Sequence, residues 1–127
     1  MGKEISGGLK NLFLFHFVAG VVFGVVYMFA PETYAQMVDW PLREVPPYRL
    51  IGAALCGFGI SSWLAYKSAI WEEVKIVVFA EIVWCGLAGL LMVWNMFAEG
   101  LPAIGWLNTG LLLFFAVAFA YFYQKEK

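Results

Sequence analysis

Two ionisable side chains stand inside long apolar runs of this 127-residue chain and are the first candidates for chemistry. His16 lies within residues 11–30, and Glu81 lies within residues 74–98. An ionisable group inside such a run is expensive to bury and is a functional candidate by default. An imidazole and a carboxyl that meet can exchange a proton, so the pair suits acid–base chemistry, proton carriage or the anchoring of a ligand.

Counting along the helices places these two groups at the same depth. His16 follows Lys10 by six residues, and Glu81 follows Lys75 by six. At 1.5 Å per residue, both are expected roughly 7–9 Å inside the same end of the protein. We therefore expect His16 and Glu81 within one bridging molecule of each other.

Other polar atoms belong to the same layer. Ser61 and Ser62 precede Lys67 by six and five residues, and Cys85 follows Glu81 by one helical turn on the same face. We predict a ligand-binding pocket in this half of the protein, on the side of the lysines. Its predicted lining is Glu81, His16, Ser61 or Ser62, and Cys85.

A second polar layer is expected toward the opposite side. It comprises Tyr27, Asn95, Asn108 and Thr109, for which hydrogen bonding between helices is the simplest interpretation. Arg49 opens the second apolar run, where it can pair with an acidic loop residue or face an anionic group.

The sequence contains no pattern typical of a cofactor or metal site. CxxC, HExxH, P-loop and GxGxxG motifs are absent, and one histidine does not indicate a metal site. Cys56 and Cys85 lie at different depths and are predicted to be free thiols. A minor alternative is haem held by His16 from two chains, which would pack through Gly20 and Gly24.

The composition indicates an integral membrane protein. Hydrophobic residues make up 63% of the chain and charged residues only 13%, whereas soluble domains carry about 25% charged residues. The net charge of −1 provides no basic surface for nucleic acid. The continuously apolar runs predict one all-α domain, an up-down-up-down bundle of four helices over residues 11–30, 48–66, 74–98 and 101–123.

Charge also predicts the orientation of these helices. Six lysines lie on the side of the two termini, whereas Arg43 and Arg49 lie on the other. This bias places both termini in the cytoplasm, most simply in a prokaryotic cell membrane. Residues 31–38 are expected to form a short interfacial helix on the outer surface, with extended backbone at Pro46 and Pro47.

The segment from Tyr48 to Gly59, which reads YRLIGAALCGFG, resembles the second span of small DoxX-like membrane proteins. In that group an arginine opens the helix and glycines follow at similar spacing. The resemblance implies a four-helix membrane fold, and some members of the group are thought to accompany quinone-linked redox systems. It assigns no role to His16 or Glu81.

Three functions fit these observations. The first is binding or transport of a small hydrophobic or weakly polar ligand, with Glu81 as polar anchor or proton carrier. The second is an accessory or anchoring subunit of a membrane complex, for example a redox-linked one. The third is a membrane enzyme with Glu81 and His16 as an acid–base pair. The expected partners are membrane lipid, a hydrophobic small molecule and other copies of the chain.

Overall fold

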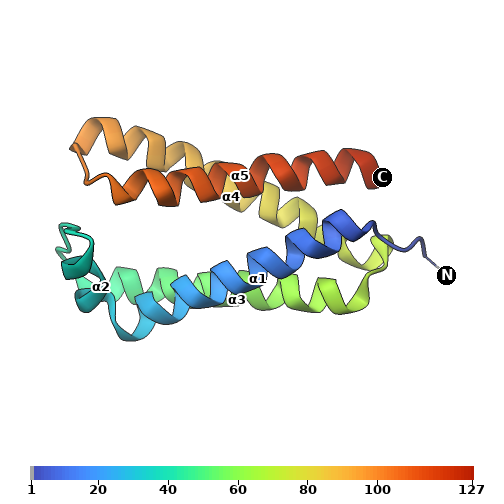
Figure 1. Cartoon of the computed structure of the whole chain (residues 1–127), viewed down its shortest axis with the longest axis horizontal. Coiled ribbons are helices and arrows are strands. Elements are labelled where there is room, and N and C mark those ends of the chain that lie inside the picture. The colour runs from blue at the N-terminus through green and yellow to red at the C-terminus, as the bar shows by residue number, and fades with distance from the viewer. Residues whose placement is uncertain (1) are drawn as a thin grey trace.

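The computed structural model describes residues 2–127 and is built from five helices (Figure 1). They are α1 (Gly7–Phe29), α2 (Pro31–Met37), α3 (Val45–Ser68), α4 (Trp71–Glu99) and α5 (Ile104–Glu126). Within residues 2–127 the extended backbone contributes only an isolated bridge between Glu4 and Ile70. The predicted all-α class is confirmed.

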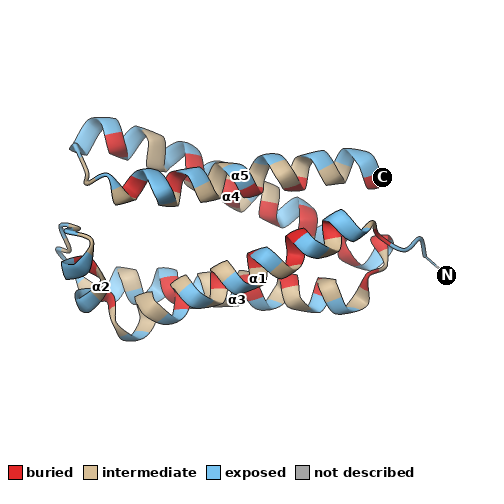
Figure 2. Cartoon of the chain, viewed as in Figure 1, coloured by how far each residue is buried: buried red, intermediate tan, exposed pale blue. Residues whose placement is uncertain are grey.

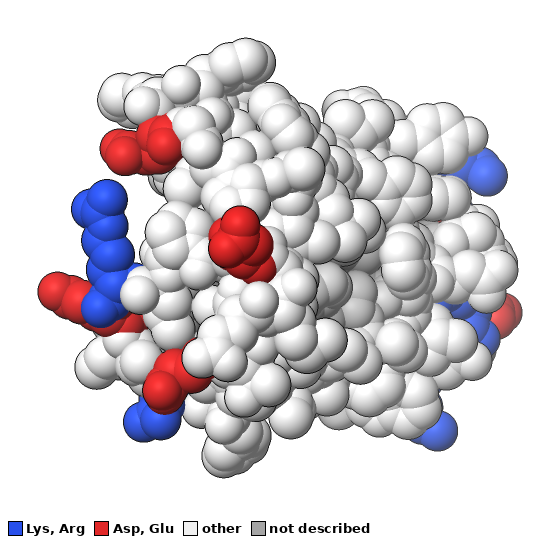
Figure 3. Space-filling model, turned by 60° about the vertical axis from the view of Figure 1, so that its left-hand side comes forward, with Lys and Arg blue, Asp and Glu red and all other residues white. Residues whose placement is uncertain are grey.

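Four of these helices, α1, α3, α4 and α5, are long and apolar enough to cross a membrane. Many of their large apolar side chains face outward, including Phe29, Trp94 and Val117 at 78%, 69% and 69% exposure. Exposed segments alternate with buried ones along every long helix (Figure 2). On the face shown in Figure 3, charged side chains gather toward the two ends and leave a broad uncharged band between them. These features indicate an integral membrane protein.

The helix ends differ from the predicted limits because local backbone chemistry sets them. α1 begins at Gly7, four residues early, since the Ser6 hydroxyl accepts a hydrogen bond from the Leu9 amide and caps the helix. The expectation of extended backbone at Pro46 and Pro47 is wrong, because both lie in the first turn of α3, where proline is well tolerated.

The fourth span also begins later than expected. Pro102 lies ahead of α5 rather than in its first turn, and its carbonyl accepts from the Gly105 amide at 2.9 Å in the turn that leads into the helix.

The helices associate as two pairs, α1 with α3 and α4 with α5 (Figure 1). Glycines allow the backbones of the first pair to approach closely. A methyl group added at Gly24 would lie 2.7 Å from the Gly52 carbonyl oxygen, and one added at Gly20 would lie 3.0 Å from the Leu55 carbonyl oxygen. Gly20 and Gly24, four residues apart on one face of α1, thus allow close packing against α3 of the same chain.

One end of the molecule is tied together by backbone and side-chain bonds. The N-terminal segment bonds to the α3–α4 turn, with Ile5 N donating to Ala69 O at 2.9 Å. Lys3 Nζ and Ser6 N both donate to Glu126, at 2.9 Å each. Both termini therefore lie at this end (Figure 1), which we call the closed end.

The interior behind the closed end is filled by packed apolar side chains. Leu9 and Phe13 of α1 meet Val74 and Val78 of α4 and Phe119 of α5, all at most 1% exposed. Phe13 and Phe119 have ring centroids 5.6 Å apart. This core holds α1, α4 and α5 in fixed register just below the level of His16.

We predict that Gly24→Ala destabilises the protein because α1 and α3 must move apart to admit the methyl group. The expected loss is about 1–3 kcal/mol of unfolding free energy, measured by reversible unfolding in mixed detergent–SDS micelles. Gly57→Ala on α3 is the matched control, since nothing lies within 4 Å of the methyl group there. Equal stability of the two variants would contradict this packing.

Candidate functional site

The two ionisable groups of the interior meet directly. His16 Nε2 lies 3.0 Å from Glu81 Oε2, and the two side chains are 6% and 0% exposed. This is closer than the bridged arrangement that we expected. α1 packs mainly on α3, and α4 mainly on α5, so this contact links one helix pair to the other. Groups at equal depth on these two helices thus meet at the centre of the protein.

Ser62 of α3 holds the other side of the imidazole. Its Oγ lies 2.8 Å from His16 Nδ1, and it is fully buried. The ring also packs edge-on against Phe115 and Phe119 of α5, with centroids 4.7 and 5.6 Å away. Both ring nitrogens are therefore engaged, and the orientation of the imidazole is set by three other helices.

Cys85 completes the cluster around the carboxyl group. Its Sγ lies 3.8 Å from Glu81 Oε2, the oxygen that also contacts His16. Glu81 Oε1 is buried and has no hydrogen-bond partner in residues 2–127. An unpaired buried carboxyl oxygen is unfavourable, so this atom is where a further proton, water molecule or cation would be stabilised.

Ser61 does not belong to the site, contrary to one of the two predicted choices. Its Oγ donates to the Phe58 carbonyl at 2.7 Å, within its own helix. Adjacent residues on an α-helix point about 100° apart. Because Ser62 faces His16, Ser61 faces away.

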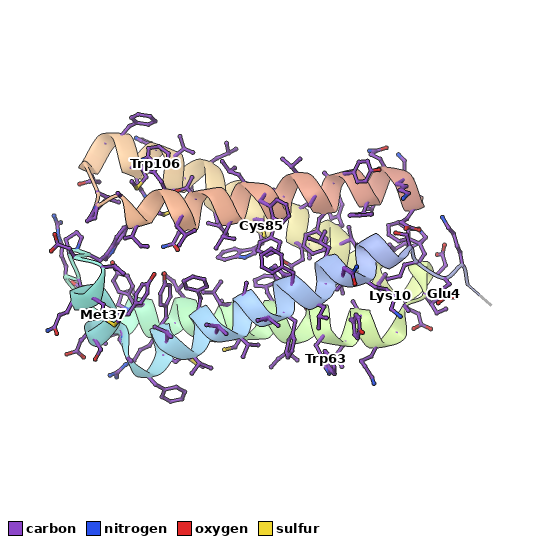
Figure 4. All side chains as sticks on the ribbon, in the orientation of Figure 1. Glu4, Lys10, Met37, Trp63, Cys85 and Trp106 are labelled. Atoms are coloured by element: carbon purple, nitrogen blue, oxygen red, sulfur yellow. The ribbon has the colours of Figure 1, made fainter. Side chains whose placement is uncertain are left out.

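A cavity of about 790 Å³ descends from the α2 end of the molecule to this cluster. His16 and Cys85 lie at its floor, and Cys85, labelled in Figure 4, stands near the middle of the molecule. Glu81 does not line the cavity itself, but its carboxyl group contacts both floor residues, His16 and Cys85. The prediction that the pocket lies in the half nearer the termini is wrong. Packed apolar side chains occupy the interior between the cluster and the termini, and the cavity that ends at the cluster lies on its other side.

The cavity walls are mainly apolar and aromatic. They include Phe23 and Tyr27 of α1, Trp84 of α4 and Phe115 of α5. The mouth is more polar, with Arg43, Tyr34, Tyr48 and Glu99. Burial raises the pKa of the Tyr34 phenol, so this group stays a neutral hydrogen-bond donor under physiological conditions.

Three residues of the predicted second polar layer line the cavity, and the fourth does not. Tyr27, Asn95 and Asn108 line the cavity, and Asn108 Nδ2 donates to Tyr27 Oη at 3.4 Å. Thr109 instead donates to the Gly105 carbonyl of its own helix at 2.7 Å. Arg49 is exposed outside the cavity, and no ion pair to it occurs within residues 2–127. Arg43, which the sequence analysis used only to orient the helices, is the arginine that lines the cavity.

The expectation about metals and haem needs revision at two points. His16, Glu81 and Cys85 each offer a donor atom, and the three atoms lie within 4.8 Å of one another. The sequence analysis placed these three residues in one pocket but did not identify them as metal ligands, because it counted histidines alone. The haem variant is wrong in its geometry, since Gly20 and Gly24 are covered by α3 of the same chain. Cys56 and Cys85 are free thiols, as predicted.

Comparison with protein-family models, curated proteins and solved structures finds no match to this chain. The resemblance to DoxX-like proteins therefore stays a prediction, and the site is interpreted from its own geometry.

We predict that His16 and Glu81 are energetically coupled. His16→Phe keeps an aromatic ring at this position but leaves the buried carboxyl group of Glu81 without its main partner. It should cost about 3–5 kcal/mol of stability. The double variant His16→Phe/Glu81→Met removes the orphaned group and should be more stable than the sum of the two single effects predicts. Reversible unfolding in mixed micelles measures this cycle. Simply additive losses would show that the two groups do not interact.

Proposed function

We propose that this protein binds a small, predominantly apolar ligand with one polar group, in the cavity that ends at His16 and Cys85. The observation that carries the proposal is the position of His16, paired with Glu81 behind it, at the floor of an apolar cavity. A volume of about 790 Å³ falls within the roughly 300–1,000 Å³ typical of small-molecule sites.

The lining favours a flat, lipid-soluble ligand. Aromatic side chains such as Phe23, Trp84 and Phe115 form the walls and pack well against rings or acyl chains. The imidazole and thiol at the floor would receive the polar group of the ligand. Glu81 would act through His16, by accepting or supplying its proton, rather than as the direct anchor.

The closed end supports binding rather than passage through the protein. Leu9, Phe13 and Phe119 are at most 1% exposed and occupy the interior between the cluster and the termini. A ligand that entered from the α2 end would stop at the polar floor. Transport would require this core to open.

Catalysis is a second candidate because the proton-transfer geometry is present. The 3.0 Å separation of His16 Nε2 and Glu81 Oε2 is within the range for direct proton transfer. Ser62 is no nucleophile in this scheme, since it is fully buried and lies outside the cavity lining. It would position the imidazole on which the ligand is held.

We further propose an up-down-up-down bundle in a prokaryotic cell membrane, with both termini in the cytoplasm and α2 at the outer interface. Six lysines near the termini, against two arginines at the α2 end, support this orientation. The cavity would then open toward the outer side.

The proposed cavity is tested by filling it. Ala88 of α4 lines the cavity, so Ala88→Phe should weaken binding of the apolar amine 1-aminoanthracene at least tenfold, or about 1.4 kcal/mol. Energy transfer from tryptophan to the bound probe reports binding in detergent.

Ala98→Phe is the control for that experiment, because Ala98 is exposed on the same helix and lies outside the lining. It should bind the probe like the original protein. Equal binding by both variants would contradict a cavity ligand site.

The orientation is tested by cysteine labelling in intact cells. Gln36→Cys in α2 should react with a membrane-impermeant maleimide, whereas Lys125→Cys near the C-terminus should not. The original chain, with only Cys56 and Cys85, gives the background. The opposite labelling pattern would reverse the proposed topology.

A further inference from the structure

We infer that His16, Glu81 and Cys85 form a binding site for a divalent transition-metal ion of the zinc class. All three side chains are buried, at 5%, 0% and 0% exposure. α1 supplies the imidazole, and α4 supplies the carboxyl and the thiol from positions one helical turn apart. This inference stands on the donor geometry and goes beyond the proposed ligand binding.

The spacing of the donor atoms fits a tetrahedral ion. Metal bonds of about 2.0–2.3 Å at tetrahedral angles place nitrogen and oxygen about 3.3 Å apart, and oxygen and sulfur about 3.6 Å apart. The corresponding separations are 3.0 Å between His16 Nε2 and Glu81 Oε2 and 3.8 Å between Glu81 Oε2 and Cys85 Sγ. The third pair, an imidazole nitrogen of His16 and Cys85 Sγ, lies within 4.8 Å, against about 3.6 Å in a tetrahedral site. A movement of the thiol by up to about 1 Å would therefore bring the three atoms into coordination.

The surroundings of the donors also match those of a metal site. Histidine ligands usually donate their other ring N–H to an oriented acceptor, and Ser62 Oγ stands 2.8 Å from His16 Nδ1. The buried, unpartnered Glu81 Oε1 lies on the ligating carboxyl group itself. A cation beside this group would compensate an atom that has no partner in residues 2–127.

Charge balance explains why an apolar interior would accept the ion. A divalent ion would replace the thiol proton of Cys85 and the proton shared between His16 and Glu81. The thiolate, the carboxylate and the neutral imidazole would then carry two negative charges against the two positive charges of the ion. The net charge of the buried cluster does not change.

The types and number of ligand atoms indicate which class of ion would bind and whether the site would be catalytic or structural. Thiolate and imidazole favour zinc-like ions over Mg²⁺ and Ca²⁺, which prefer oxygen ligands. Three protein ligands leave a fourth position free, which is the arrangement of catalytic rather than structural zinc. Because His16 and Cys85 line the cavity, this position would face it. If the proposed ligand binds there, its polar group would coordinate the ion.

Cobalt reports such a site directly in the full-length protein. Metal-stripped protein in detergent is titrated with Co²⁺, whose bond to a thiolate gives a near-ultraviolet charge-transfer band and whose tetrahedral geometry gives strong visible bands. We expect both bands to saturate at one ion per chain and to disappear when Zn²⁺ is added in stoichiometric amount.

Variants assign the ligands and separate metal binding from protein folding. Cys85→Ser should remove the charge-transfer band, and Glu81→Gln should weaken Co²⁺ binding at least tenfold. Cys56→Ser alters the other free thiol, which lies outside the cluster. This variant should change neither the charge-transfer band nor the affinity for Co²⁺. Circular dichroism of each variant verifies helical folding.

The result that overturns the inference is the absence of saturable Co²⁺ binding in the original protein, or a charge-transfer band that survives Cys85→Ser. Neither result depends on 1-aminoanthracene binding, so the metal site and the apolar ligand site can fail separately.

Discussion

The hydrogen-bonded chain from Ser62 through His16 to Glu81 is the interaction on which the rest of the site depends. It joins α3, α1 and α4 at the centre of an apolar molecule, with separations of 2.8 and 3.0 Å. A buried carboxyl group is tolerated in such surroundings only when it is paired or neutralised. The chain therefore explains why α1 and α4, which belong to different helix pairs, are held in register.

The two ends of the molecule differ in how they surround the Ser62–His16–Glu81 hydrogen bonds. At the closed end, bonds from Lys3 and Ser6 to Glu126 and a packed apolar core fix the helices. At the α2 end, the helix pairs enclose a cavity whose floor is His16 and Cys85. Close contact at Gly24 and Gly52 keeps α1 against α3, so the hollow lies between the pairs rather than within one. A fixed floor and an open mouth are what a binding site requires.

Much of the fold follows from patterns that sequence alone reveals, and the rest depends on tertiary geometry. Continuous apolar runs indicate membrane spans, because a helix needs about 20 apolar residues to cross the hydrocarbon core. Equal depths along the helices indicate that His16 and Glu81 share a layer. Residue counting cannot fix helix rotation, which is why Ser61 and Ser62 stayed alternatives. It also cannot show where helix pairs diverge, so the cavity was expected in the wrong half. The sequence places Cys85 in the same layer as His16 and Glu81, but only the three-dimensional placement of α1 and α4 shows that their donor atoms lie within 4.8 Å of one another.

The most direct test of this account is nitrogen-15 NMR of the imidazole, because His16 is the only histidine in the chain. With labelled histidine, both ring nitrogens should show hydrogen-bonded chemical shifts. Glu81→Gln should move the Nε2 signal most, and Ser62→Ala should move the Nδ1 signal most. Ring signals that neither substitution changes would show that the imidazole is not held between these groups, and the central claim would be wrong.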